Sequence, residues 1–347
     1  MIAEPEHRDF LAVTDLLPVM DLHCDLLAYM ANIDGADPMS SEIGCALPLL
    51  QAGNVRFQTL AIFAITGEGS VESGIAQAAA FEELLEEYSD SVQPFDSMGV
   101  SDLADTLDND DAGSRVTIIT AIENASAFCS EDDDIDDGFD TLETMITMTA
   151  PLLYISLTHN EENRFGGGNF SDNVGLKPDG EVLLEFLSGR NVAVDLSHTS
   201  DALARDILEY LDARRLDVPV IASHSNFRTV YDHVRNLPDD IAKEIIARGG
   251  LIGINFCREF LDDEDSDVLI DHIVYGIEEL GGSSAIAFGS DFFYTPDDSE
   301  FFYEHRSAAQ FPTILHTCAL HLRSDELHNL AFGNVRRFLR RLWEGDG

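Results

Sequence analysis

Basic residues are scarce in this sequence. Only 20 lysines and arginines accompany 65 aspartates and glutamates among 347 residues, so the formal net charge is −45. A surface with this charge repels nucleic-acid phosphates and anionic lipid headgroups, so neither nucleic acid nor a membrane is an expected partner. The acidic residues are spread along the whole chain, as in a solvated, halophile-like surface that self-repulsion keeps soluble. A field that attracts cationic ligands is the alternative.

Cysteine and long apolar runs are also scarce. The five cysteines are scattered, odd in number and without a C-x-x-C pair, which favours reduced thiols over a disulfide framework. The first residues, MIAEPEHRDF, contain neither the basic nor the apolar region of a signal peptide. No apolar run approaches the roughly 18 residues of a membrane span. We therefore expect a cytoplasmic protein.

The sequence does contain a repeated alternation of short apolar runs and longer helical patterns. Between the runs, apolar residues recur every three to four positions, as in GIAQAAAFEELLEEY and SDALARDILEYLDARR. Near-continuous apolar strands alternating with helices indicate a parallel sheet covered by helices. Eight such units predict a (β/α)8 TIM-type barrel, with a doubly wound open sheet as the alternative. The eight runs are residues 19–25, 55–65, 116–123, 152–159, 191–198, 218–224, 250–256 and 285–291.

The domain organisation predicted from this pattern is simple. No low-complexity linker divides the chain, and 45% hydrophobic residues can form a large core. Single α/β barrels reach this length. We expect an N-terminal extension over residues 1–18 and one barrel domain over residues 19–343. The oligomeric state stays open, and a homodimer is one alternative.

Several of the apolar runs end in a residue that can bind a metal ion or move a proton. In a (β/α)8 barrel the carboxyl ends of all strands meet at one face, where active sites lie. Residues far apart in the sequence would then converge on one cavity. These residues are Asp25, Glu123, His159, His198, His224 and Asp291.

The first run contains a pair suited to one divalent ion. His23 and Asp25 are two residues apart, so their side chains point to the same side of a strand. An imidazole and a carboxylate placed in this way can share an ion. Cys24, between them, should face the opposite side as a packing residue.

Glu123 ends an otherwise apolar strand, where a buried carboxylate needs a metal, a cation or hydrogen-bond donors. We interpret it as a ligand that bridges two ions, with a salt bridge as the alternative.

The later runs add two histidines and a carboxylate. His198 and His224 end consecutive strands. Each could be a hydrogen-bonded core histidine, but together they are interpreted as ligands of a second metal. Asp291 ends the last run and is the natural acceptor for the proton of a metal-activated water, with capping of the following segment as the alternative.

These stretches together resemble the renal or membrane dipeptidase family of the amidohydrolase barrels. They occur in the family's order and extend over most of residues 19 to 340. The similar stretches are DLHCDLL (21–27), IENASAF (122–128), YISLTHNEEN (154–163), VDLSHTSD (194–201), PVIASHSNFR (219–228), HVRNLPDD (233–240), GGLIGINF (249–256) and FGSDF (288–292).

The resemblance implies a zinc dipeptidase with two Zn²⁺ ions, or another divalent metal, that share one carboxylate. A hydroxide bridging the ions would attack the amide bond of a dipeptide. The metal can lower the pKa of water from about 15.7 to about 7. The ligands implied are His23, Asp25 and Glu123 for one ion, and Glu123, His198 and His224 for the other.

The resemblance also implies roles for three further residues. His159 would polarise the substrate carbonyl or steady the tetrahedral intermediate. Arg235 would bind the free carboxylate of the substrate, and Asp291 would accept and relay the proton. Another binuclear amidohydrolase acting on N-acyl amino acids, lactams or lactones is the nearest alternative. A non-catalytic metal-binding protein is an alternative of a different class.

The chain departs from the family pattern after Asp291. The family often continues with Asp-Phe-Asp-Gly, whereas Phe292, Phe293 and Tyr294 follow here. This difference alters the loop over the expected cavity and therefore bears on side-chain specificity rather than on the metal ligands.

Overall fold

A parallel barrel of eight strands forms the centre of the computed structural model, which describes residues 17–96, 115–149, 151–262 and 267–344. The strands follow one another in the sheet in the order β7-β6-β5-β4-β2-β1-β9-β8. They are β1 (Val19–Cys24), β2 (Val55–Phe63), β4 (Val116–Glu123), β5 (Leu152–Ser156), β6 (Ala193–Asp195), β7 (Val220–Ile221), β8 (Ile252–Ile254) and β9 (Ile286–Phe288).

The two ends of this sheet meet and close the barrel. Ala222, directly after β7, pairs with Ile252 of β8 in a parallel bridge. The Ala222 amide donates to the carbonyl oxygen of Leu251, and the Gly253 amide donates to that of Ala222, each over 2.8 Å. The prediction of a closed (β/α)8 barrel is therefore confirmed, and the open sheet is excluded. A further short strand that the sequence did not indicate, β3 (Val92–Pro94), pairs with the beginning of β4.

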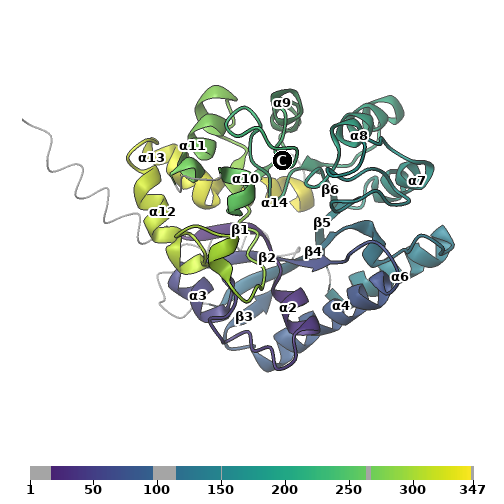
Figure 1. Cartoon of the computed structure of the whole chain (residues 1–347), viewed down its shortest axis with the longest axis horizontal. Helices are drawn as coiled ribbons and strands as arrows, with labels where there is room; N and C mark the ends of the chain where they lie inside the picture. Colours follow the sequence, from purple (N-terminus) through teal and green to yellow (C-terminus); the bar gives the residue numbers. More distant parts are fainter. Residues whose placement is uncertain (1–16, 97–114, 150, 263–266, 345–347) are drawn as a thin grey trace, which may run out of the picture.

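Helices surround the strands (Figure 1). Most of these helices follow directly after a strand in the sequence, as a barrel built of βα units requires. They are α2 (Leu26–Asn32), α3 (Leu47–Ala52), α4 (Ser70–Glu87), α6 (Ile135–Thr149), α7 (Pro178–Leu187), α8 (Asp201–Arg214), α9 (Asp239–Ala247), α10 (Arg258–Leu261), α11 (Val268–Val274), α12 (Phe311–Cys318), α13 (Ser324–His328) and α14 (Asn334–Glu344). Short 3₁₀ segments cover Ala125–Ala127, Asp298–Glu300 and Ala308–Gln310, and π-helical turns cover Tyr275–Glu279 and Asn329–Gly333.

Helix α8 illustrates how the sequence produces these elements. Ser200 caps its beginning, because the Ser200 hydroxyl oxygen accepts a hydrogen bond of 3.0 Å from the amide of Leu203. Arg215 ends it in a left-handed conformation, with φ of 56°. Between these ends, buried apolar residues recur at helical spacing and pack on the barrel. They are Leu203, Ala204, Ile207, Leu208 and Leu211.

The strands end earlier than the apolar runs suggest. His159, His198, His224 and Asp291 each lie three residues beyond the end of β5, β6, β7 and β9, in the loops that leave the barrel. The backbone of His198 and Asp291 is left-handed, with φ of 68° and 62°, which an extended strand cannot accommodate. The loops therefore begin before these residues, and their side chains reach the barrel mouth from loops.

The predicted extension over residues 1–18 lies almost entirely outside the described residues, so the division at residue 19 stays a prediction. All five cysteines are buried and free of disulfides, including Cys24, which packs in the core. Within the described ranges, no helix combines the length and apolar character needed to cross a membrane.

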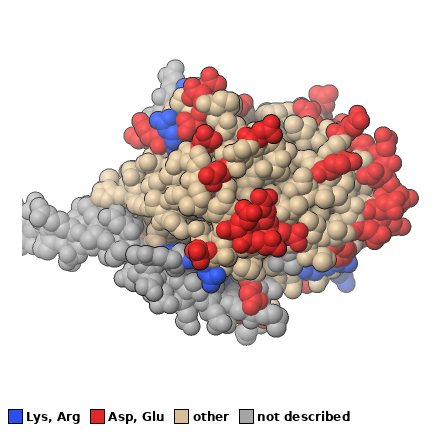
Figure 2. All heavy atoms as spheres, turned by 90° about the horizontal axis from the view of Figure 1, so that it is seen from below, with Lys and Arg blue, Asp and Glu red and all other residues tan. Residues whose placement is uncertain are grey.

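Acidic side chains are distributed over the surface, and Figure 2 shows many more of them than basic ones on the face in view. At a net charge of −45 this surface repels itself, and salt screens the repulsion because the Debye length falls from about 10 Å at 0.1 M to about 3 Å at 1 M.

We therefore expect the melting temperature to rise by at least about 2–4 °C between 0.1 M and 1 M KCl. In domains of about 150–250 residues, a shift of this size corresponds to about 1 kcal/mol of stability. Calorimetric or circular-dichroism melts across this range measure the effect. A flat or falling melting temperature would contradict it.

Candidate active site

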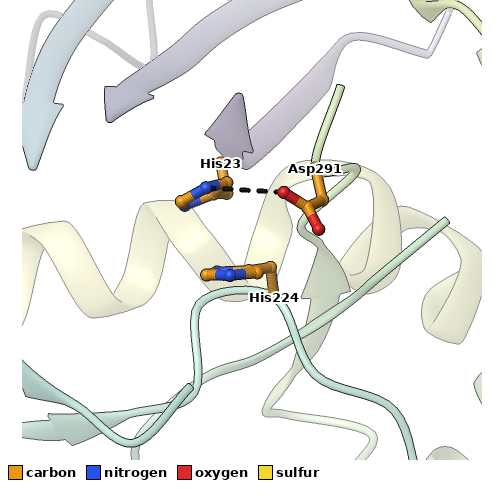
Figure 3. Close-up of side chains that lie close together, drawn as sticks. All are labelled: His23, His224 and Asp291. Atoms are coloured by element: carbon orange, nitrogen blue, oxygen red, sulfur yellow. Dashed lines mark ion pairs between the residues drawn. The ribbon is translucent and has the colours of Figure 1, made fainter. Parts of the chain in front are cut away.

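The carboxyl ends of the strands bring together three carboxylates and three histidines. Their ligand atoms form three groups, each with all atoms within 4.8 Å of one another. Two of the groups are the ligand sets expected from the sequence, and they share Glu123. The third consists of His23, His224 and Asp291, which come from three different elements (Figure 3). The groups are His23, Asp25 and Glu123; Glu123, His198 and His224; and His23, His224 and Asp291.

Glu123 occupies the centre of this cluster. Its Oε1 lies 2.8 Å from Nε2 of His198 and 3.3 Å from Nε2 of His224. Its Oε2 lies 3.3 Å from Nε2 of His23. The two oxygens of one carboxylate thus face two different sets of donors, which is the geometry of a bridging ligand.

Hydrogen bonds orient His23 so that a lone pair faces the cluster. Its Nδ1 lies 2.7 Å from the Tyr154 hydroxyl, and that hydroxyl donates its own hydrogen to the carbonyl oxygen of Leu22 over 3.0 Å. Tyr154 must therefore accept from the Nδ1–H of His23, so the neutral form of the ring has its lone pair on Nε2. Among the described residues, this buried Nε2 has no hydrogen-bond partner, and neither has Oδ1 of Asp25, 3.7 Å away.

The other two histidines are oriented in the same way. Nδ1 of His198 lies 2.9 Å from Oδ1 of Asn160, and Nδ1 of His224 lies 2.7 Å from the Ser223 hydroxyl. That hydroxyl donates to Asp195, so it accepts from His224. Both Nε2 atoms therefore carry lone pairs, yet they lie only 2.9 Å apart. Two facing lone pairs repel unless a cation lies beside them, so these residues fit a divalent metal ion.

The charges in the cluster lead to the same conclusion. Burial alone would lower the pKa of His23, but the negative charges of Glu123, Asp25 and Asp291 raise it to about 10. Burial, and next the charge of Glu123, raise the pKa of Asp25 well above its usual range. Burial raises the pKa of Asp291 to about 6. Three largely buried carboxylates within reach of one another need positive charge, and a set of imidazole and carboxylate donors suits zinc or a similar ion.

Asp291 is held at the edge of the cluster. Its Oδ2 accepts a hydrogen bond of 2.7 Å from the side-chain amide of Asn255, and its Oδ1 lies 3.6 Å from Nε2 of His23. The Asp291 amide donates to the carbonyl oxygen of His23 over 3.1 Å. One carboxylate oxygen is thus fixed by an amide while the other faces the cluster.

His159 lies beside the cluster, in the wall of a cavity. Nε2 of His159 is 4.0 Å from Oε1 of Glu123, and its ring packs edge-on against Phe63, with centroids 4.8 Å apart. A cavity of about 410 Å³ opens over the cluster and is lined by His159 together with Asp25, Glu123, His198 and Asp291. Burial and the charge of Arg235 lower the pKa of His159, so its ring is neutral at neutral pH.

Arg235 is not part of this lining. It is 2% exposed and donates to the Ser225 hydroxyl and to the carbonyl oxygen of His224, each over 2.8 Å. Its Nε has no hydrogen-bond partner in the part of the chain that the structure describes. The guanidinium carbon lies 5.4 Å from the ring centroid of Phe260, which does line the cavity.

Two buried carboxylates that the sequence reasoning missed support the cluster from behind. Asp21 accepts hydrogen bonds from the amide and hydroxyl of Ser290, next to Asp291, over 2.8 and 2.5 Å. Asp195 accepts from the amides of Ser197 and Ser223, next to His198 and His224, over 3.1 and 2.7 Å. An aspartate inside an apolar run, two or three residues before a histidine, is the signal that could have indicated them.

Known proteins resemble this chain in sequence and in structure. Dipeptidase verJ of Clonostachys rogersoniana is 34% identical over 144 residues, which are 40% of this chain and 36% of that protein. This chain spans only about a third of the length of the curated relatives it matches. A solved dipeptidase of metallopeptidase family M19 has a TM-score of 0.78 at 21% identity, with 95% of this chain and 100% of the other covered. A Rhodobacter sphaeroides metallopeptidase, solved with a phosphinate mimic of L-Ala-D-Ala, has a TM-score of 0.78 at 20% identity, covering 94% and 99%.

The family assignment rests on the match over almost the whole chain. The sequence profile described as Membrane dipeptidase (Peptidase family M19) matches residues 7–344. This range contains all the cluster residues and all the strands of the barrel. The chain therefore belongs to the membrane dipeptidase family, peptidase family M19.

Proposed function

We propose that this chain is a metal-dependent hydrolase that cleaves the amide bond of dipeptides. The observation that carries the proposal is the pair of ligand sets sharing Glu123 beneath a cavity that His159 and Asp291 also line. Membership of the dipeptidase family supports it, as does the dipeptide mimic bound to the Rhodobacter sphaeroides relative in fold. A cytoplasmic location and a homodimer remain predictions.

The residues divide into two metal sites and a set that handles the substrate. His23, Asp25 and Glu123 would hold one zinc ion, and Glu123, His198 and His224 the other. Two such ions supply a polarised substrate carbonyl and a water whose pKa falls from about 15.7 to about 7.

Three side chains of the chain then act on the substrate and its protons. Asp291, oriented by Asn255, accepts the proton of the attacking water on the oxygen that faces the cluster and passes it to the departing amine. Neutral His159 donates a hydrogen bond to the carbonyl oxygen from the cavity wall. Arg235, whose Nε is unpartnered, binds the free carboxylate of the substrate.

A panel of substrates distinguishes dipeptide hydrolysis from the alternative functions. Zinc-incubated protein should hydrolyse dipeptides faster than N-acyl amino acids, lactams and lactones, because the family's relatives are named as dipeptidases. Liberated amino acids measured by chromatography give the rates. Faster turnover of N-acyl amino acids would favour the alternative binuclear amidohydrolase. If no substrate is hydrolysed, the alternative of a non-catalytic metal-binding protein is favoured.

Removing Arg235 tests the recognition of the carboxylate. Arg235→Ala should raise KM for dipeptides on the order of 10–100-fold with a smaller change in kcat, because a hydrogen bond to a charged group contributes about 1.5–3 kcal/mol. For a dipeptide whose carboxylate is replaced by an amide, wild type and variant should have similar KM. Arg205→Ala, at an exposed position on α8, is the matched control. An unchanged KM for free dipeptides would exclude this role.

A further inference from the structure

Beyond the metal ligands, the walls of the cavity are aromatic. Six aromatic side chains line it, drawn from α2, β2, α10 and the segment after β9. Outside the cluster, Glu259 is the one charged residue in the lining, and no lysine or arginine belongs to it among the described residues. The six are Tyr29, Phe63, Phe260, Phe293, Tyr294 and Phe301.

Contacts between the rings hold this wall in place. Tyr29 and Tyr294 pack with centroids 5.0 Å apart, and Phe293 meets Phe301 edge-on at 5.3 Å. Aromatic pairs at these separations are favourable and restrict the rotation of both rings. The cavity therefore offers a formed apolar surface, so a ligand does not have to order it.

The segment after Asp291 accounts for two of these rings. Phe292 is fully buried, and its carbonyl oxygen accepts a hydrogen bond of 3.0 Å from the amide of Asp25. This contact fixes the start of the segment against the end of β1. The next two residues, Phe293 and Tyr294, are half-buried and line the cavity.

We propose that this wall selects dipeptides with a large apolar side chain, preferably an aromatic one, and rejects acidic side chains. This inference rests on the proposed dipeptidase function. Transfer of an apolar side chain from water to the wall is favourable, and an aromatic side chain gains ring contacts in addition. An acidic side chain would lose its hydration against an aromatic wall in which Glu259, outside the cluster, is the one charged residue among the described residues.

The test is a comparison of kcat/KM over two peptide series, Ala-X and X-Ala, with X as Ala, Leu, Phe, Asp and Lys. In at least one series we expect Phe and Leu to exceed Ala by about tenfold or more, the size of effect that small apolar differences produce in a hydrophobic pocket. Asp should fall below Ala in the same series.

Variants then assign the preference to the wall. Tyr294→Ala should lower the ratio of kcat/KM for Phe over Ala severalfold, whereas Tyr294→Phe, which keeps the ring, should retain it. Phe293→Ala should act in the same direction, and a thermal melt shows whether it is folded; if it is not, the Tyr294 pair decides. Tyr210→Ala, at a half-buried position on α8 outside the cavity, should leave the ratio unchanged.

The outcomes separate this inference from the function on which it rests. If no peptide in either series is hydrolysed, the proposed function fails and the inference fails with it. If peptides are hydrolysed but Ala, Asp and Phe give similar kcat/KM, the function stands and the inference is overturned. A Phe preference that Tyr294→Ala and Phe293→Ala both retain would also overturn it, because the wall would not be its source.

Discussion

Replacing Glu123 with alanine should empty both metal sites and abolish hydrolysis. Its two oxygens lie 2.8–3.3 Å from the Nε2 atoms of three histidines, so its loss removes a donor from both predicted ligand sets and the main negative charge between them. After incubation with zinc and removal of free ions, elemental analysis should give about two ions per wild-type chain and close to none for Glu123→Ala.

Variants of the other predicted ligands test the two metal sites separately. His198 belongs to one of the three candidate ligand groups and Asp25 to another, whereas His224 belongs to two. His198→Ala and Asp25→Ala should therefore each lower the metal content by about one ion, and His224→Ala should chiefly empty the site that it shares with His198. Glu143→Ala, on the exposed side of α6, is the control for loss of a carboxylate. Full zinc content in Glu123→Ala would exclude a bridging role.

Replacing Asp291 with asparagine should lower kcat on the order of 10²–10⁴-fold, the usual size of general acid–base assistance. Asparagine keeps the size of the side chain but cannot accept the proton, whereas the two predicted ligand sets stay complete without it. Metal content should stay near the wild-type value, and KM should change little. Steady-state kinetics on the best dipeptide, together with elemental analysis, measure both.

A disturbed fold can be distinguished from the loss of proton transfer. Asn255 donates to Oδ2 of Asp291, so Asp291→Asn could rotate the side chain, and a thermal melt close to that of wild type shows that the fold is retained. Asp140→Asn, at an exposed position on α6, should leave kcat unchanged. Near wild-type turnover in Asp291→Asn would mean that another group accepts the proton.

The sequence by itself determined the barrel and the residues that gather at its mouth. Buried parallel strands need near-continuous apolar runs, and the helices between them need a three-to-four-residue repeat, so both appear in local patterns. A carboxylate or histidine at the end of such a run, as at Glu123 and His224, is costly to bury without a partner and therefore marks a site.

Only the tertiary structure decided how these residues are oriented and what surrounds them. His23 is oriented by Tyr154, which is 131 positions away, and Ser290 is held by Asp21 across 269 positions. Arg235 is buried outside the lining, and the aromatic wall combines residues from both halves of the chain. Local patterns report whether a side chain is buried, but which partner it meets depends on how the barrel closes, because closure alone brings distant strands and their loops into contact.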